Sequence, residues 1–149
     1  TGLNITHFYI NELFEHIFQL MQPSLTQKNI ELEIILNDPL MTIDADISLL
    51  EQALINLILN AIEAVKDTTE PLIMLAAEFN KDHTEIKVTD NGSGIPDNIA
   101  DKIFIPFFTT RKNGNGIGLS LCKQIMMLHN GKIRMTTAVG KGTCFTISL

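Results

Sequence analysis

The sequence has few of the residues that mark several classes of protein. Its 149 residues include no tryptophan, one tyrosine and two cysteines, Cys122 and Cys144. These cysteines have neither metal-ligand spacing nor the density of a disulfide scaffold, so we expect two reduced packing thiols and a cytoplasmic protein. Only 11 basic residues oppose 17 acidic ones, which gives a net charge of −6. Without a broad positive field, nucleic acid is not an expected partner.

Long apolar runs, repeats and low-complexity linkers are also missing. No run approaches the roughly 20 residues of a membrane helix and no signal peptide begins the chain, so we expect no direct membrane contact. The hydrophobic content of 45% is ample for one core. The sequence therefore predicts a single domain over residues 1–149. Because Thr1 is not an initiator methionine, we expect this domain to be a piece of a longer protein.

Hydrophobic periodicity changes repeatedly between helical and strand-like spacing. The turn residues at 37–39 predict a hairpin between the two strands beside them. Alternating helices and hairpin-linked strands predict an α+β fold, a two-layer α/β sandwich with a mixed, mostly antiparallel sheet and helices on one face. The predicted helices are about 7–27, in which Pro23 ends or bends the helix, Asp46–Lys66 and Gly116–His129. The predicted strands are Ile30–Leu36, Met41–Ile43, Pro71–Phe79, His83–Thr89, Lys132–Thr137 and Thr143–Leu149, and the last two form a final hairpin around residues 139–142.

The helix predicted from Asp46, which is a good N-cap, carries a polar strip opposite its apolar face. Gln52, Asn56, Asn60 and Glu63 share one arc at 3.6 residues per turn. A solvated face is the alternative interpretation, but such a face more often carries Lys, Glu or Gln than the mediocre helix former asparagine. A recessed strip would line a pocket. Since an amide oxygen is a suitable ligand for Mg²⁺, Asn60 is the candidate metal ligand.

Asp90 ends a predicted strand in which Ile86, Val88 and Asp90 alternate onto one face. Its carboxylate is therefore expected to point inward, where it needs a donor such as the exocyclic amine of adenine. The residues after it, Asn91 to Gly94, supply the permissive backbone that a flat ring could approach. An ordinary Asx turn is the alternative, and this segment alone favours it.

A second glycine cluster, Gly114 to Gly118, precedes an apolar helix. Backbone amides at such a helix start attract phosphates, although a flexible loop is the plain alternative. Phenylalanines and two cations, Arg111 and Lys112, lie just before it and have the composition of a lid over bound phosphates. Core phenylalanines and a solvated Arg111 are the alternative there.

Taken in order, these motifs resemble those of one protein family. Residues 52–61 are similar to the N box, 90–94 to the G1 box, 104–108 to the F box, 114–119 to the G2 box and 140–145 to the final glycine box. The family is that of the catalytic, ATP-binding domains of two-component sensor histidine kinases. It belongs to the GHKL superfamily, which includes gyrase, Hsp90 and MutL and shares the Bergerat fold. The resemblance spans essentially the whole chain.

The resemblance implies a role for each motif. Asp90 would bind the adenine amine, helped by Thr143 through water, and Asn60 would hold Mg²⁺. Arg111, Lys112 and the glycine loop would contact phosphates, and the catalytic residues would be Asn56, Arg111 and Lys112. The implied nucleotide-binding residues are Asn56, Asn60, Asp90, Gly92, Gly94, Ile95, Gly114, Asn115, Gly116, Ile117, Gly118, Leu119 and Thr143.

The implied activity is transfer of the γ-phosphoryl group of Mg-ATP to a histidine on a separate dimerisation hairpin, with a response regulator downstream. The full-length protein could then be membrane-anchored. The chain departs from the common pattern at Glu63, where many relatives carry Lys or Arg. Moreover, none of its four histidines has a phosphoacceptor setting, so we expect the acceptor hairpin to lie outside these residues and the isolated domain to transfer little.

Three other functions remain open on the same motifs. A GHKL-type ATP hydrolase would need a glutamate where this chain has Asn56, which cannot act as a base at neutral pH. A serine kinase could be built on the same fold. A non-enzymatic module whose lid changes a partner surface when ATP binds is the third alternative.

Overall fold

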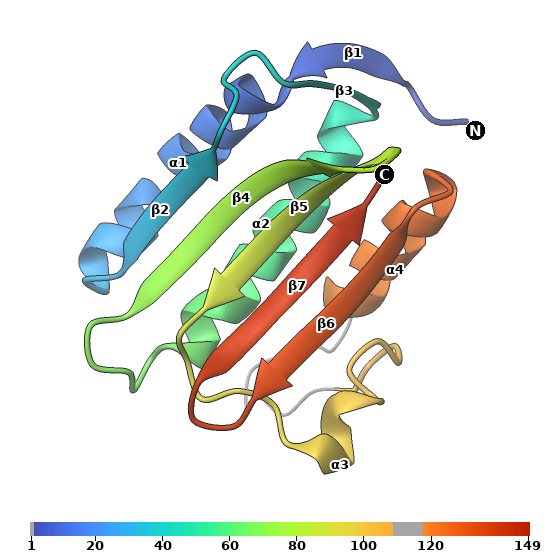
Figure 1. The fold of residues 1–149 in the computed structure, drawn as a ribbon. Coiled ribbons are helices and arrows are strands. Elements are labelled where there is room, and N and C mark those ends of the chain that lie inside the picture. Colours follow the sequence, from blue (N-terminus) through green and yellow to red (C-terminus); the bar gives the residue numbers. More distant parts are fainter. Residues whose placement is uncertain (1, 109–117) are drawn as a thin grey trace.

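The computed structural model describes residues 2–108 and 118–149. Helices are interspersed with strands along these residues (Figure 1). The strands are β1 Thr6–Tyr9, β2 Glu31–Leu36, β3 Thr42–Ala45, β4 Leu72–Asn80, β5 His83–Asp90, β6 Lys132–Ala138 and β7 Gly142–Ser148, and the helices are α1 Ile10–Gln27, α2 Ile47–Ala64, α3 Asp97–Ala100 and α4 Gly118–Leu128.

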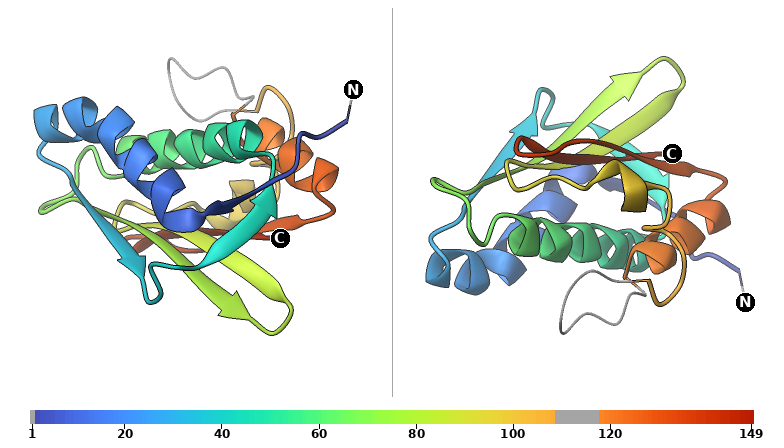
Figure 2. Two further views of the ribbon diagram at one scale, coloured as in Figure 1. Left: turned by 90° about the horizontal axis from the view of Figure 1, so that it is seen from above. Right: turned by 90° about the horizontal axis from the view of Figure 1, so that it is seen from below.

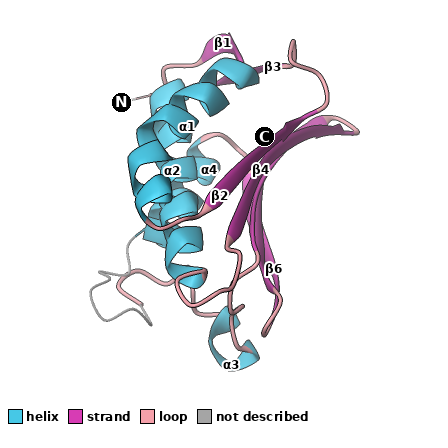
Figure 3. Ribbon diagram, turned by 90° about the vertical axis from the view of Figure 1, so that its left-hand side faces the viewer, coloured by secondary structure: helices cyan, strands magenta, loops and turns pink. Residues whose placement is uncertain are grey.

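The main sheet has five strands in the order β2-β4-β5-β7-β6. Strand β2 runs parallel to β4, and every other neighbouring pair is antiparallel. Helices α1, α2 and α4 form one layer over one face of the sheet, and the other face is open (Figures 2 and 3). This arrangement confirms the predicted α+β fold, with helices on one side of a mixed, mostly antiparallel sheet.

The core lies between the helix layer and the sheet. Leu50, Leu54 and Leu57 of α2 are fully buried, as are Ile73 of β4 and Ile86 of β5. Among the described helices, α2 alone has the length and composition of a membrane-crossing segment. In this fold its apolar face packs on the sheet instead, which is what an amphipathic helix of a two-layer protein does.

The N-terminus of α2 is fixed by Asp46, as predicted. The Asp46 carboxylate accepts hydrogen bonds from the backbone amides of Leu49 (3.2 Å) and Asn4 (3.1 Å). The Asp46 amide donates to Nε2 of His129 (3.0 Å), whose Nδ1 donates to the Ile125 carbonyl (2.8 Å). These bonds join the start of α2 to the end of α4, so the two helices that flank the pocket described below are held together.

The prediction of a helix from about residue 7 was wrong at its start. Residues 6–9 form β1, which pairs antiparallel with β3, and α1 begins only at Ile10. The helical apolar spacing itself begins at Ile10, whereas Phe8 alone is buried in the alternating segment before it. Pro23 does not end α1: it lies on the exposed side, where water can bond to the carbonyl that its missing N–H leaves free.

The predicted hairpin between residues 30–36 and 41–43 was also wrong. The turn itself forms, because the Asp38 carboxylate accepts the Leu40 amide at 2.9 Å. Strand β2 nevertheless pairs with β4, and β3 pairs with β1 in a separate two-stranded sheet. Turn residues reverse the chain, but long-range pairing decides which strands become neighbours. The predicted final hairpin is present as β6-β7, and the two strands predicted at 71–79 and 83–89 pair as the hairpin β4-β5.

Candidate functional site

A pocket of about 270 Å³ opens between α2, the turn after β5, the start of α4 and β7. Its size is close to the lower end of the range for small-molecule sites, which is about 300 Å³. Segments that are distant in the sequence therefore meet here. The lining residues are Asn60, Glu63, Ala64, Lys66, Asp90, Ser93, Gly94, Ile95, Pro96, Ile99, Ile103, Phe108, Gly118, Leu119, Thr143 and Phe145.

One end of the pocket, called here the Asp90 end, consists of Asp90, Gly92, Gly94 and Thr143. The Asp90 side chain points inward as predicted, and the residue is 7% exposed. One of its carboxylate oxygens accepts the Gly92 amide at 2.8 Å. Burial raises the pKa of the Asp90 carboxyl above the ordinary aspartate value, while the backbone amides of Gly92 and Thr143 act in the opposite direction. A buried acceptor is thus held facing the pocket.

The backbone around Asp90 is packed too closely for side chains. A Cβ on Gly92 would lie 2.3 Å from the Ala64 carbonyl oxygen. A Cβ on Gly142 would lie 2.0 Å from the Asp90 carbonyl oxygen, and Gly142 has a φ of +127°. The Ser93 amide donates to the Ala64 carbonyl at 3.2 Å, which ties the turn to α2. These contacts give the Asp90 end a fixed shape.

Hydroxyl groups extend this network toward β6 and β7. The hydroxyls of Thr137 and Thr143 lie 2.9 Å apart, and the Ile95 amide donates to the Thr137 hydroxyl at 2.9 Å. Thr143 pairs directly with Asp90 across the strands. The structure therefore brings the predicted residues Asp90, Ile95 and Thr143 together at one wall.

The opposite end, called here the Asn60 end, consists of Asn60, Gly118 and Leu119, with Asn56 next to Gly118. Asn60 lines the pocket, and its buried Nδ2 has no hydrogen-bond partner among the described residues. Asn56 does not line the pocket but lies behind Gly118: a Cβ added there would be 3.7 Å from the Asn56 Oδ1. A buried amide without a partner is costly, which indicates that a ligand completes this end.

The residues at the Asn60 end suit a hard cation that brings its own ligands. The described residues contain no cluster of three or more histidine, cysteine, aspartate or glutamate side chains that could hold a metal ion. Mg²⁺ is commonly bound by few protein oxygens and completes its shell with phosphates and water. The Asn60 amide can offer one oxygen to the ion and its free N–H to a phosphate. The side chains present therefore fit Mg²⁺ accompanied by phosphate.

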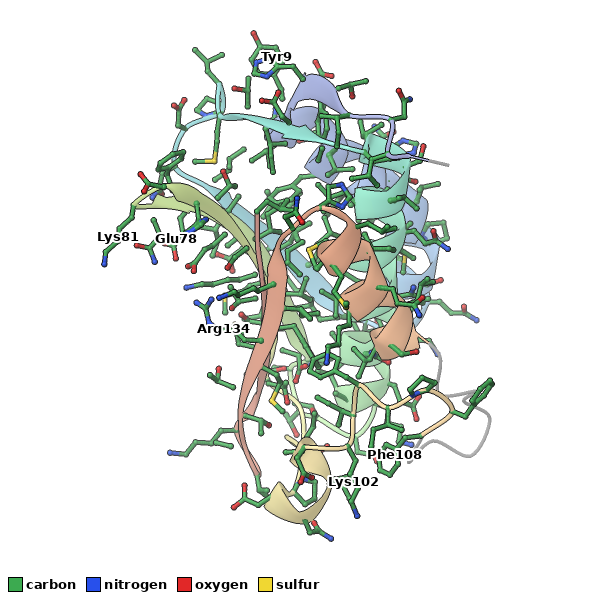
Figure 4. All side chains as sticks on the ribbon, turned by 90° about the vertical axis from the view of Figure 1, so that its right-hand side faces the viewer. Tyr9, Glu78, Lys81, Lys102, Phe108 and Arg134 are labelled. Carbon is green, nitrogen blue, oxygen red and sulfur yellow. The ribbon has the colours of Figure 1, made fainter. Side chains whose placement is uncertain are left out.

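The sequence interpretation missed most of the apolar lining. Ile99 lies in α3, and Ile103 lies in the turn after it. Phe108 also lines the pocket, at the end of the same segment, which was expected to be a loop. Figure 4 places Phe108 and Lys102 at the end of the molecule that carries α3. The phenylalanines of residues 104–108 were the available signal, and Phe104 does pack edge-to-face on Phe145, with ring centroids 6.3 Å apart.

Glu63 and Lys66 form the rim of the pocket, and Lys66 had no sequence signal. Its Nζ lies 2.9 Å from the Glu63 Oε1. The other predicted site residues, which are Arg111, Lys112, Gly114, Asn115, Gly116 and Ile117, lie outside the described residues.

Comparison with known proteins gives a consistent family. The sequence model of the family described as histidine kinase-, DNA gyrase B- and HSP90-like ATPase matches residues 45–149. The sensor histidine kinase ZraS of Escherichia coli (strain K12) is 38% identical over 149 residues, which are all of this chain and 32% of that protein. The signal transduction histidine-protein kinase AtoS of the same strain is 35% identical over 140 residues, covering 94% of this chain and 23% of that protein. The chain thus spans about a third or less of these relatives.

Solved structures agree over nearly the whole chain. The nucleotide-free catalytic domain of histidine kinase ThkA is 33% identical with a TM-score of 0.88, covering 99% of this chain and 95% of that one. Full-length ShkA in complex with AMPPNP is 26% identical with a TM-score of 0.88, covering 99% of this chain and 31% of that one. ThkA in complex with the response regulator protein TrrA is 31% identical with a TM-score of 0.83, covering 97% and 41% respectively.

Proposed function

The chain belongs to the histidine kinase-, DNA gyrase B- and HSP90-like ATPase family and is an ATP-binding domain, and we propose that it catalyses phosphoryl transfer from ATP to a histidine in two-component signalling. The observation that carries the proposal is the pocket itself. It joins a buried carboxylate acceptor at the Asp90 end to an amide without a partner at the Asn60 end. One nucleotide would complete both.

Adenine would bind at the Asp90 end. The Asp90 carboxylate, already oriented by the Gly92 amide, would accept a hydrogen bond from the exocyclic amine, with the Thr143 hydroxyl assisting through water. Ile95, Ile99 and Ile103 would cover the ring faces. A carboxylate has no proton to donate, so this end would select a base that presents a donor.

The phosphates would lie toward the Asn60 end, where Asn60 would hold Mg²⁺ and α4 begins. The ion would neutralise phosphate charge when bound. Gly118 and Leu119 start α4, whose first amides are suited to an anion, and Asn56 lies directly behind them. Arg111, Lys112 and the remaining glycine-loop residues stay predicted phosphate contacts, since they lie outside the described residues.

Catalysis would consist of positioning and charge neutralisation. A nitrogen of the acceptor imidazole would attack the γ-phosphorus while the bond from that phosphorus to the β–γ bridging oxygen breaks, leaving ADP. The acceptor histidine would lie on the dimerisation hairpin of the same kinase, and a response regulator would take the phosphoryl group next. The complex of ThkA with the response regulator TrrA supports a response regulator as partner, and the relatives named as sensor histidine kinases support the kinase activity. The hairpin partner and a cytoplasmic site of action are part of the proposal.

ATP hydrolysis is the second candidate activity, and the structure supports it less. Of the described residues that line the pocket, only Glu63 and Asp90 are carboxylates. Asp90 is committed to the base, and Glu63 follows Asn60 by three residues instead of occupying the position of Asn56, where the hydrolase glutamate would stand. Asn56 itself has no basic group. We therefore expect slow hydrolysis. A serine kinase and an ATP-gated interaction module would be separated from a histidine kinase by the product of transfer.

Two measurements test the proposal. Calorimetric titration with ATP, with and without Mg²⁺, should show saturable binding that the metal strengthens. Incubation with labelled ATP and the hairpin of the parent kinase should then give a phosphoprotein that acid destroys and base preserves, as expected for phosphohistidine. An acid-stable product would indicate a hydroxyl acceptor instead, and binding without any transfer would favour the interaction module.

A further inference from the structure

We propose that Lys66 is a nucleotide-binding residue whose ammonium leaves Glu63 and pairs with the phosphate next to the ribose when nucleotide binds. The inference rests on the proposed function, because it assigns an additional contact to the same pocket. Its starting point is the charge of the pocket. The ionisable side chains among the described lining residues are Glu63, Asp90 and Lys66, so two carboxylates face one cation.

This charge balance is unfavourable for a polyphosphate. Glu63 lies one helical turn after Asn60, on the same side of α2, and would repel phosphates that approach the Asn60 end. Lys66 now neutralises it: the Nζ to Oε1 distance is 2.9 Å, and hydrogen bonding with Glu63 is the main reason that the pKa of Lys66 is raised. The Lys66 ammonium is therefore paired at the rim of the pocket with a carboxylate, and water weakens the attraction between the two charges.

The backbone of Lys66 is fixed while its side chain is free to turn. Val65 beside it is 1% exposed, and the Thr68 amide donates to the Val65 carbonyl at 2.9 Å. By contrast, the Lys66 side chain is 64% exposed and that of Glu63 is 40% exposed. An exposed pair of this kind is weakly held, so a phosphate group can compete for the lysine.

The position of Lys66 selects the phosphate that it can reach. At 1.5 Å per residue, Ala64 at the end of α2 lies about 6 Å along the helix from Asn60, and Lys66 follows two residues later. That displacement is toward the Asp90 end, since the Ser93 amide bonds to the Ala64 carbonyl. If Asn60 holds the metal among the outer phosphates, the lysine lies nearer the base and reaches the phosphate adjoining the sugar.

The test compares adenosine, AMP and ADP by calorimetry on the parent and on Lys66→Met, which keeps an unbranched side chain without the charge. We expect AMP and ADP to bind about tenfold more weakly to the variant and adenosine to bind unchanged. Lys132→Met is the matched control, because this exposed lysine begins β6 and does not line the pocket. It should change none of the three affinities.

A second pair of variants separates direct contact from screening. In a Glu63→Gln background, Lys66→Met should still weaken AMP and ADP. If the loss disappears there, Lys66 only neutralises Glu63 and the proposal is wrong. An equal loss for adenosine, or a loss for ADP but not AMP, would overturn it as well. If the parent binds adenosine and ADP and Lys66→Met binds them with the same affinities, this inference alone is rejected. If the parent binds neither, the proposed function is rejected.

Discussion

The Asp90 end and the Asn60 end of the pocket differ in how far the protein completes them by itself. At the Asp90 end the carboxylate already accepts the Gly92 amide, and the surrounding backbone groups bond to one another. At the Asn60 end the amide nitrogen of Asn60 is buried and has no partner among the described residues. The hydrogen bonds of the Asp90 end are therefore formed without a ligand, whereas the hydrogen bonding of the Asn60 end is completed only when a ligand binds.

This difference has a physical reason. A flat base is recognised by fixed geometry, and close backbone packing supplies that without mobile side chains. Phosphates and their metal bring strong charges of their own, so the protein needs only donors and oxygens that are left free for them. Changes at the Asp90 end should therefore damage folding or all nucleotide binding, and changes at the Asn60 end only the part that depends on metal and phosphate.

The largest effect is expected from Gly142→Ala. The added Cβ would lie 2.0 Å from the Asp90 carbonyl oxygen at a φ of +127°. Backbone strain and overpacking together should lower the free energy of unfolding by about 3 kcal/mol or more and abolish nucleotide binding. Chemical denaturation of the parent and the variant measures the first effect.

Gly140→Ala is the matched control for that variant. Gly140 lies two residues before Gly142, in the turn that precedes β7, with a φ of +81°, but its Cβ would meet no atom within 4 Å. Only the backbone conformation opposes it, so the loss should be about 1 kcal/mol. Equal losses in the two variants would mean that close approach to Asp90 is unimportant.

Asp90→Asn should remove nucleotide binding from a folded protein. The amide would place a donor opposite the adenine amine inside a buried site, a mismatch of about 3 kcal/mol or roughly a hundredfold in affinity. Titration with adenosine and with ATP should show the same loss, because both share the base. If the variant still binds adenosine with the parent affinity, the base does not bind at Asp90. Circular dichroism of the variant serves as the control that it is folded.

Asn60→Ala should impair only the binding of metal and phosphate at the Asn60 end. We expect Mg-ATP to bind about tenfold more weakly and adenosine to bind as in the parent. Because the buried Nδ2 has no described partner, its removal should change the free energy of unfolding by less than about 1 kcal/mol. Binding of Mg-ATP at the parent affinity would reject Asn60 as the metal ligand.

The smallest effect concerns pH. Burial raises the pKa of Asp90, so its carboxyl contributes stability that is fully present below the unfolded-state pKa and lost as the pH rises through the folded-state pKa. Asp90→Asn does not titrate. The stability of the variant relative to the parent should therefore increase as the pH rises above the ordinary aspartate pKa of about 4. Denaturation at several pH values tests this, and a relative stability that is constant with pH would contradict the burial effect.

Local sequence features predicted the elements whose partners are adjacent in the chain. The Asp46 cap, the apolar face of α2 and the hairpins β4-β5 and β6-β7 all follow from periodicity and turn residues. The inward direction of Asp90 followed from strand alternation. These predictions succeeded because each depends on residues within one or two elements.

The predictions that failed depended on partners far along the chain. Residues 6–9 became a strand because β3 lies beside them, and β2 left its expected partner because β4 offered a parallel edge. The short helix α3, with its single isoleucine Ile99, gave no periodic signal over four residues. Lys66 had no motif at all, and only the end of α2 and its ion pair with Glu63 place it on the pocket.

By itself, the sequence determined the fold class, the family resemblance and the chemical type of each end of the pocket, since these reside in residue types and short spacings. Tertiary structure brings Asn60, Asp90 and Thr143 into one pocket, as the resemblance implied, and it alone decided that Asn56 lies behind Gly118 and that Lys66 joins the rim. The physical reason is that burial and hydrogen-bond satisfaction depend on neighbours brought together by packing. Whether the Asn60 amide finds a partner can be read only once those neighbours are in place.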